Sequence, residues 1–417
     1  MSEPTSPAGR RFRPSLLALT ALNSAVSGIV TSGIAFITRQ GYDFSALENY
    51  GLAGCIGLTY VVGACTAGRI VARLRAYAST RALLAWQLLA MGSLCALPSV
   101  CGPWAVWPLA LIYSPLAGIL WPIIESYVSG GRGGERLRSA IGTWNTVWAG
   151  ALVVSYVAIT PYCESHPAAT LLCLGVVQAL SALALLGLPR DPLPHVDEPH
   201  PHAPEFAHFL NAFRLLLPTG YLLYTALSPF VPNAMERLAI DRHLHAALFA
   251  VALLLPRTLG FVVLTRWHGW HGRWSFPLAG SVLLLGGFAL AIGASWAASG
   301  AWGVCLHLAG LAAFGCGMSA VYQGAIYYAM EVGQSEVAAG GTHELLIGVG
   351  YTVGPLFGVA SAAAVRGGWL ARSDFELGVL LPALAVALWV THRAWHVGHR
   401  RRRARSQVGR GAGVPAA

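Results

Sequence analysis

The chain has 417 residues, of which 55% are apolar and only 11% are charged, and its mean hydropathy is +0.58. In soluble domains about a quarter of the residues are charged. This composition therefore excludes an ordinary soluble protein and predicts one surrounded mostly by lipid. The formal net charge of +10 does not by itself indicate a nucleic-acid partner, since the distribution of the basic residues follows membrane topology.

Apolar segments of transmembrane length recur along the whole chain. A spanning helix needs about 20 largely apolar residues, and it satisfies its backbone hydrogen bonds without help from lipid. The first run follows Arg13 and is too long for a signal peptide, so we expect an uncleaved first helix. The predicted spans are 15–38, 46–67, 81–99, 105–127, 138–160, 168–188, 209–230, 246–265, 276–296, 303–327, 342–364 and 376–391. The sequence therefore predicts an all-α membrane protein of twelve transmembrane helices.

A polar stretch, 189–208, divides these spans into six and six. It is rich in proline, histidine and acidic residues, which is typical of a solvated linker. Its histidines lack the thiolates and the fixed spacing of a metal site, so we expect no metal there; they are His195, His200, His202 and His208. The predicted organisation is a cytoplasmic segment 1–14, a six-helix bundle 15–188, the linker, a second bundle 209–397 and a basic tail 398–417.

All 27 basic residues are arginines, and most fall on one side of this topology. If both termini are cytoplasmic, 20 of the 27 arginines lie in the cytoplasm: Arg10, Arg11, Arg13, Arg69, Arg73, Arg75, Arg81, Arg132, Arg136, Arg138, Arg190, Arg266, Arg273, Arg393, Arg400, Arg401, Arg402, Arg403, Arg405 and Arg410. This bias predicts a multi-pass protein of the cytoplasmic (inner) membrane with both ends inside. The tail arginines suit lipid headgroups, and no nucleic-acid partner is expected.

The two halves repeat each other in register. Glu125 closes the fourth span and Glu331 closes the tenth, and sixteen residues after each glutamate comes an Ile-Gly pair, at Ile141 and at Ile347. Such a repeat predicts two pseudo-symmetric six-helix bundles, the arrangement of transporters whose halves rock about a site at their interface.

The loop between the second and third spans resembles the loop signature of the major facilitator superfamily. Gly68 and Arg73 match that signature, whereas Ala72 stands where the family has an acid and Arg75 where it has a glycine. The resemblance covers nearly the whole chain and implies a secondary transporter of two six-helix bundles.

Two further motifs are similar to sequences of this family. The run Gly350 to Gly358, with Gly354 and Pro355 inside it, resembles a glycine–proline motif that drug–proton antiporters carry in their fifth helix, although here it falls in the eleventh. The segment Tyr327 to Glu331 and the pair His343-Glu344 that follows it are similar to a bacterial branch of permeases of unassigned substrate.

Ionisable residues inside the spans are the first candidates for function, because burying charge in a membrane is costly. Arg257 follows Pro256 near the middle of the eighth span. It is read either as a ligand for a substrate carboxylate or as an arginine that extends to the membrane surface. His307 is read either as a site for a coupling proton or as a packing histidine.

Aromatic and amide side chains complete the candidate substrate site. Trp121 precedes Glu125 by four residues, and Tyr327 and Tyr328 precede Glu331 by four and three, so each ring lies on or beside the carboxylate's face. An interfacial aromatic belt is the alternative. Asn145 and Trp148 share a face of the fifth span, and the buried amide needs a partner in substrate or in a neighbouring helix. The predicted substrate-binding residues are Arg257, Asn145, Trp148, Trp121, Tyr327 and Tyr328.

The predicted cytoplasmic gate comprises Arg69, Arg73, Glu125, Glu331, His343 and Glu344. The resemblance implies that the family's loop acid meets the start of the eleventh helix. Here Glu344 follows Thr342, a predicted N-cap, so we expect Glu344 to attract Arg73 or Arg69 across the two halves in the outward-open state. Capping of the helix by Glu344 alone is the alternative.

Enzymatic signatures are weak in this sequence. His343-Glu344 lacks the second histidine of a zinc helix, and the chain contains no Walker loop. We therefore expect no enzyme, no cofactor and no metal. The predicted function is secondary transport of a small amphipathic organic solute by alternating access, by a monomer, with export and import both left open. A transporter-like protein that acts as a sensor or assembly partner is the alternative.

Cys101 and Cys163 are read either as a disulfide or as small packing residues.

Overall fold

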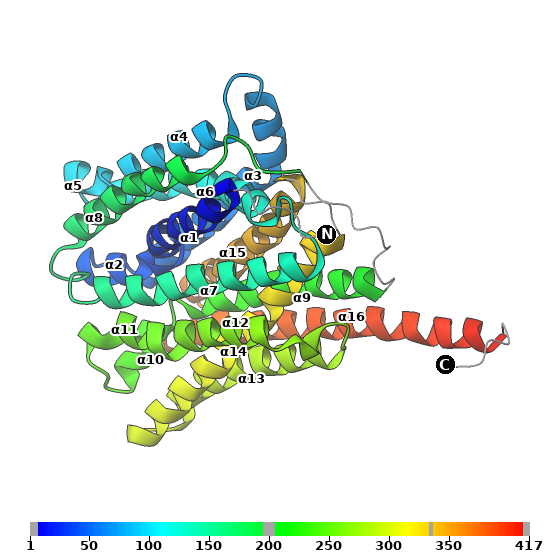
Figure 1. Ribbon diagram of the computed structural model, residues 1–417. Helices are drawn as coiled ribbons and strands as arrows, with labels where there is room; N and C mark the ends of the chain where they lie inside the picture. The colour runs from blue at the N-terminus through cyan, green and yellow to red at the C-terminus, as the bar shows by residue number, and fades with distance from the viewer. Residues whose placement is uncertain (1–6, 195–204, 333–336, 412–417) are drawn as a thin grey trace.

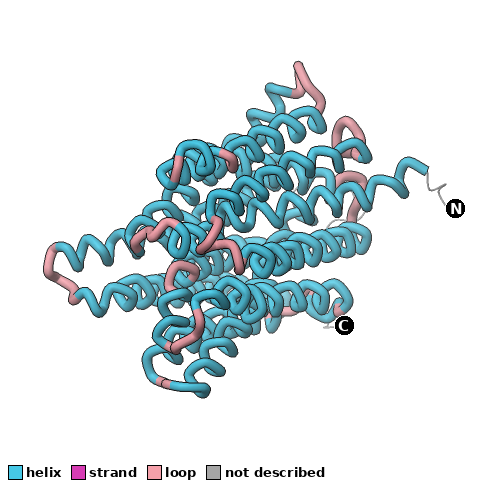
Figure 2. Tube along the Cα trace, turned by 90° about the vertical axis from the view of Figure 1, so that its left-hand side faces the viewer, coloured by secondary structure: helices cyan, strands magenta, loops and turns pink. Residues whose placement is uncertain are grey.

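The computed structural model describes residues 7–194, 205–332 and 337–411, and this described part is helical throughout, with short connecting loops (Figures 1 and 2). The prediction of an all-α protein is therefore confirmed for these ranges. The side where α1 begins and α16 ends is called the terminal side, and the opposite side, which carries the turn before α3 and helix α10, is called the far side (Figure 1).

The first half of the chain runs from α1 to η3. Its elements are α1 (Pro7–Gly28), the π-helical η1 (Ile29–Gly33), α2 (Ile34–Gly41), α3 (Ala46–Leu74), α4 (Thr80–Leu94), α5 (Leu97–Cys101), η2 (Pro103–Ala105), α6 (Val106–Ser129), α7 (Gly134–Ile159), α8 (Pro167–Leu180) and η3 (Ser181–Gly187). Ser45 caps α3 in a capping box with Glu48, which explains why this helix begins where it does.

The second half runs from α9 to α16. Its elements are α9 (Glu205–Leu227), α10 (Val231–Arg237), η4 (Arg242–Leu244), α11 (His245–Phe249), the π-helical η5 (Ala250–Leu254), α12 (Leu255–Arg266), η6 (His268–Trp270), α13 (Ser275–Ala297), α14 (Gly300–Val332), α15 (Val337–Arg366), η7 (Arg372–Asp374) and α16 (Phe375–Gly411). Helix α16 continues through most of the predicted tail. Residues 195–204 of the predicted linker lie outside the described residues.

Ten helices in the described part are long and apolar enough to cross a membrane, and eleven if the bent pair α9 and α10, at 46° to each other, is one span. The remaining predicted span is α7. It carries Glu135, Arg136 and Arg138 in its first turns and Asn145 in its middle, which lowers its hydropathy. These polar residues are consistent with a helix that faces protein on much of its surface.

The two halves meet along α3 with α15 and along α7 with α12. Glycines permit the first of these contacts: a Cβ placed on Gly57 would lie 2.4 Å from the backbone carbonyl carbon of Tyr351. The backbones of α3 and α15 therefore approach closely, as small residues allow between membrane helices. In the second contact, Gly142 of α7 lies against Thr265 at the end of α12.

Candidate functional site

A cavity of about 80 Å³ lies between the two halves. Helices of both halves line it, and its wall is made of small hydroxyl residues, aromatic rings, one arginine and one glutamate. The lining residues are Ser24, Ser27, Gly28, Thr31, Ser32, Tyr60, Trp121, Trp144, Trp148, Leu152, Tyr221, Tyr224, Arg257, Tyr322, Glu344, Ile347 and Tyr351.

In each half of the chain, a helix near this cavity contains an irregular, π-helical segment. The π-helical segment η1 supplies Thr31 and Ser32, and the π-helical segment η5 ends at Leu254, two residues before Pro256 and three before Arg257. π-Helical segments are rare and concentrate at functional sites. Pro256 lies within the continuous helical span Arg242–Arg266, where a proline removes one backbone hydrogen bond of the helix.

Arg257 is buried, with 2% of its surface exposed. Its Nη2 donates a hydrogen bond to the Tyr221 hydroxyl at 3.0 Å, and its guanidinium carbon lies 4.5 Å from the centre of the Trp148 ring. Within the described ranges it forms no ion pair, and its Nε has no hydrogen-bond partner. The side chain therefore faces the cavity and does not extend to the membrane surface.

Aromatic rings surround this guanidinium. Trp148 contacts Tyr322 at a centroid distance of 5.2 Å and Phe261 at 5.5 Å. The ring centroids of Trp121 and Trp144 are 6.1 Å apart, and those of Trp144 and Trp148 are 6.5 Å apart. Of the predicted substrate-binding residues, the structure thus brings Arg257, Trp148 and Trp121 to one cavity.

Asn145 lies behind this wall and does not line the cavity. Its Nδ2 donates to Gln323 Oε1 at 2.7 Å, and its Oδ1 accepts from Trp148 Nε1 at 2.9 Å. The partner of the buried amide is therefore the neighbouring helix α14 together with the Trp148 indole.

Tyr327 and Tyr328 lie away from the cavity, on the terminal side. Tyr328 stacks on Phe209 at 5.2 Å and accepts a hydrogen bond from the Gly272 N–H at 3.1 Å. Tyr327 packs edge-on against Trp270 at 5.5 Å. Both rings pack against side chains of the second half and do not line the cavity.

Several tyrosines that line the cavity were not among the predicted substrate-binding residues. Tyr60, Tyr221, Tyr224, Tyr322 and Tyr351 all line the cavity; the first four are buried and Tyr351 is partly buried. A tyrosine inside a span is a usable signal, because its hydroxyl needs a polar partner when the ring is buried. Tyr221 and Tyr224, three residues apart on α9, show the helical spacing that brings two hydroxyl groups to one face.

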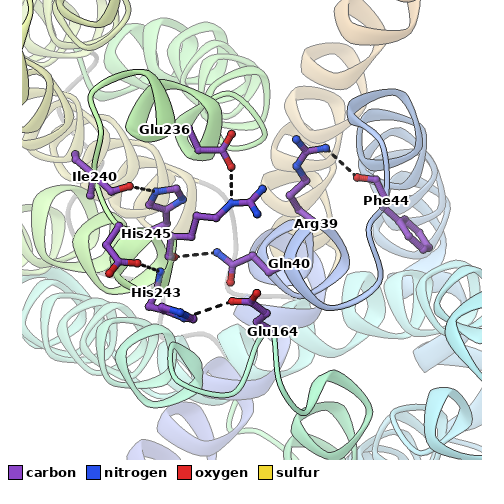
Figure 3. Close-up of polar contacts among 10 residues, drawn as sticks. Arg39, Gln40, Phe44, Glu164, Glu236, Ile240, His243 and His245 are labelled. Carbon is purple, nitrogen blue, oxygen red and sulfur yellow. Dashed lines mark hydrogen bonds and ion pairs between the residues drawn. The ribbon is translucent and has the colours of Figure 1, made fainter.

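Contacts between the halves close the far side of the cavity. Gln40 Nε2 of α2 donates to the Arg242 carbonyl oxygen at 3.2 Å, and His243 Nδ1 lies 3.4 Å from Glu164 Oε2 (Figure 3). Arg242 itself pairs with Glu236 at 2.9 Å. The first two contacts join segments that are far apart in the sequence and that belong to different halves.

The terminal side is closed by backbone packing. A Cβ on Gly341 of α15 would lie 2.9 Å from the Ala64 carbonyl oxygen of α3, and one on Gly68 would lie 3.5 Å from Ala338. Contacts between the halves therefore lie on both sides of the cavity.

The predicted pairing of Glu344 with Arg69 or Arg73 is wrong in this structure. Helix α15 begins at Val337, so Glu344 lies within it, and its carboxylate faces the cavity and accepts a hydrogen bond from the Tyr60 hydroxyl. Arg69 and Arg73 are exposed at the end of α3. The alternative of simple helix capping fails for the same reason, since Thr342 Oγ1 bonds the Ala338 carbonyl oxygen inside the helix.

Two predicted gate residues join Glu344 inside the protein. Glu125 of α6 and His343 are both buried, and the ligand atoms of the three side chains lie within 4.8 Å of one another. Glu331, the counterpart of Glu125 in the repeat, is buried at the end of α14 and is not part of this cluster.

His307 and the cysteines, which the sequence left with two readings each, have defined surroundings in the structure. His307 Nδ1 lies 2.8 Å from the Ala291 carbonyl oxygen, so it packs between α13 and α14 and does not reach the cavity. All eight cysteines lie in the described ranges and are free, Cys101 exposed and Cys163 buried.

No protein-family model matches the sequence, and no curated protein is similar to it. The fold, however, is similar to those of solved transporters. A variant of the nucleoside transporter NupG has a TM-score of 0.66 at 14% identity, covering 93% of this chain and 99% of that chain. A bacterial homologue of the human lysosomal transporter Spinster, in an inward-facing and unoccupied conformation, has a TM-score of 0.60 at 14% identity, covering 96% and 98%. FucP, a major facilitator superfamily transporter in the outward conformation, has a TM-score of 0.58 at 15% identity, covering 91% and 98%. At these identities the likeness concerns the fold alone.

Proposed function

We propose that this chain, which has the fold of major facilitator superfamily transporters, is a secondary transporter of a small amphipathic organic solute that carries an anionic group. One observation carries the proposal: Arg257 is buried in a cavity between the halves without a carboxylate partner among the described residues. An unpaired buried charge is strongly unfavourable, and a solute carboxylate in the cavity would supply the missing charge.

The surrounding side chains support an amphipathic solute. The planar guanidinium can pair with a carboxylate through two parallel hydrogen bonds. Trp121 and Trp148 offer flat apolar surface, and the Ser24 hydroxyl is buried without a partner in the described chain, so it is available to a polar group of the solute. NupG is a nucleoside transporter by name; nucleosides carry no charge at neutral pH, so the proposed solute class differs from that of NupG.

Transport would follow from alternating access. The halves meet mainly where α3 and α6 pack against α15 and where α7 packs against α12, and opening either side requires one set of contacts to separate while the other persists. We propose twelve spans, both termini in the cytoplasm, a monomer in the cytoplasmic membrane, and export as the direction. Cysteine labelling at Leu193, beside the sixth span, tests this orientation: labelling from outside intact cells would contradict it.

The decisive experiment compares solute fluxes and binding. Metabolites exported by a deletion strain and by its complement identify candidate solutes, and the purified protein then transports each candidate in proteoliposomes. Arg257→Ala should weaken binding of the anionic solute by about 10- to 100-fold, since a hydrogen bond to a charged group contributes about 1.5–3 kcal/mol. Arg257→Lys should restore only part of this. Arg273→Ala, which removes an exposed arginine of the same half, is the control.

Two results would contradict the proposal. Transport by Arg257→Ala at the wild-type rate and affinity would remove Arg257 from solute binding. Unchanged fluxes in the deletion strain, together with a stable partner protein on purification, would favour a sensor or assembly role instead.

A further inference from the structure

Three buried side chains with metal-ligand chemistry meet between the two halves. Glu125 comes from α6 in the first half, and His343 and Glu344 come from α15 in the second. Their exposed fractions are 2%, 2% and 3%, and one ligand atom from each lies within 4.8 Å of the other two. Residues separated by more than 200 positions in the sequence are thus brought to one point.

This cluster lacks positive charge. His343 Nε2 is buried without a hydrogen-bond partner in the described part of the chain, and the Glu125 carboxylate, also buried, meets no hydrogen-bond donor there other than a proton shared with Glu344. No arginine of that part forms an ion pair with either carboxylate. The cavity cation, Arg257, is engaged by Tyr221 and the Trp148 ring. Two carboxylates this close together in a low-dielectric interior need either a shared proton or a bound cation.

The donor set distinguishes between cations. Mg²⁺ and Ca²⁺ prefer oxygen ligands alone, whereas an imidazole nitrogen beside carboxylate oxygens suits a divalent first-row transition metal such as Zn²⁺, Co²⁺ or Mn²⁺. His343 Nε2 is the observation that favours a metal over a shared proton, because a proton between the two carboxylates would leave this buried nitrogen without a partner.

The surroundings of the cluster suit such an ion. A Cβ on Gly340 would lie 2.5 Å from Glu125 Oε2, so the absence of a side chain there leaves space for the carboxylate. The Tyr60 hydroxyl donates to Glu344, which orients it as an outer partner orients a metal ligand. Glu344 also lines the cavity, so a fourth coordination position can face it.

We propose that Glu125, His343 and Glu344 bind one divalent transition-metal ion, which bridges the two halves. The ion stabilises the conformation in which the terminal side is closed, because it has ligands from both halves only while α6 and α15 are in contact. This site does not depend on the identity of the transported solute, and its test does not require transport.

Metal binding to the full-length protein tests the proposal. The protein is purified without a histidine tag, treated with a chelator, loaded with Co²⁺ or Zn²⁺ and desalted. His195→Ser, His200→Ser and His202→Ser are present in every sample, so that these linker histidines cannot contribute. About one ion per chain is expected by elemental analysis, with a Co²⁺ absorption spectrum of nitrogen and oxygen ligands.

Variants then locate the ion. Glu125→Gln, His343→Gln and Glu344→Gln should each lower affinity by at least about tenfold, and Glu331→Gln, which changes the matching glutamate of the repeat, should not. Metal should also raise the melting temperature of the protein in which Glu125, His343 and Glu344 are unchanged, and this measurement needs no cluster variant. Failure to bind metal, or equal binding by Glu125→Gln and Glu331→Gln, would overturn the site and leave a proton shared by the two carboxylates.

Discussion

Asn145 Nδ2 donates a hydrogen bond to Gln323 Oε1 at 2.7 Å and thereby joins α7 of the first half to α14 of the second. The same amide accepts from Trp148 Nε1 at 2.9 Å. Asn145 therefore acts on the cavity indirectly, because it fixes the ring that lies over Arg257.

Replacing Asn145 should loosen both partners. Asn145→Ala leaves the Gln323 amide and the Trp148 indole N–H buried and unpaired, and each such group costs about 1–3 kcal/mol. We expect a lower melting temperature for the purified protein and several-fold weaker solute binding. Thr143→Ala, on an exposed face of the same helix where the hydroxyl bonds only the Ser139 carbonyl oxygen, should change neither. Equal behaviour of the two variants would show that the Asn145 amide has no positioning role.

The close approach of α3 and α15 gives a steric prediction. Gly57→Ala would place a Cβ 2.4 Å from the Tyr351 backbone, a distance that cannot be relieved by rotating a side chain. We expect reduced stability and loss of transport, because the proposed transport cycle requires these helices to separate and return. Gly286→Ala is a matched control, since a Cβ there meets nothing within 4 Å. Wild-type melting and transport by Gly57→Ala would mean that the helices do not pack this closely in the membrane.

The far-side contact between His243 and Glu164 predicts a small shift in the conformational equilibrium. Glu164→Gln removes the acceptor charge at 3.4 Å from His243 Nδ1 (Figure 3). An exposed pair contributes at most about 1 kcal/mol, so opening of the far side should become several-fold more frequent. Labelling of a cysteine at Ser32 in the cavity, in a cysteine-free background, measures this opening. Glu135→Gln, which breaks a pair within α7, should leave the labelling rate unchanged.

Asp191 predicts a pH dependence of stability outside the membrane. Its Oδ1 accepts from the Thr80 hydroxyl at 2.6 Å and from the Thr80 N–H at 2.9 Å, and these hydrogen bonds lower the pKa of the carboxyl below 3.8. A lowered folded-state pKa gives stability that is present above the unfolded value and is lost as the pH falls through the folded value. Asp191→Asn should therefore melt earlier than the wild type at neutral pH, and the difference should shrink below about pH 4. A difference that is constant with pH would exclude the carboxylate as its cause.

Much of the fold was determined by the sequence itself, because lipid imposes one rule on every span. Apolar runs of sufficient length predict helices wherever they occur, and each predicted span corresponds to a helix or a broken helix of the structure. The repeat of Glu125 and Glu331 predicted two related halves, and the depth of Arg257 made it a candidate for the site, with extension to the membrane surface as the alternative. These inferences hold because span length, helical spacing and the cost of buried charge are local properties.

Which polar side chains face one another was decided only by the tertiary structure. Sequence spacing could not decide whether the partner of Glu344 is Arg73 or another residue. The rotation of α15 about its axis determines that Glu344 meets Tyr60 and Glu125 instead. The same holds for Tyr328, which helical spacing placed beside Glu331 but which packs on Phe209 away from the cavity. The partners of a buried polar group lie on other helices, and their identity depends on the orientation and depth of every helix in the bundle, which no single segment encodes.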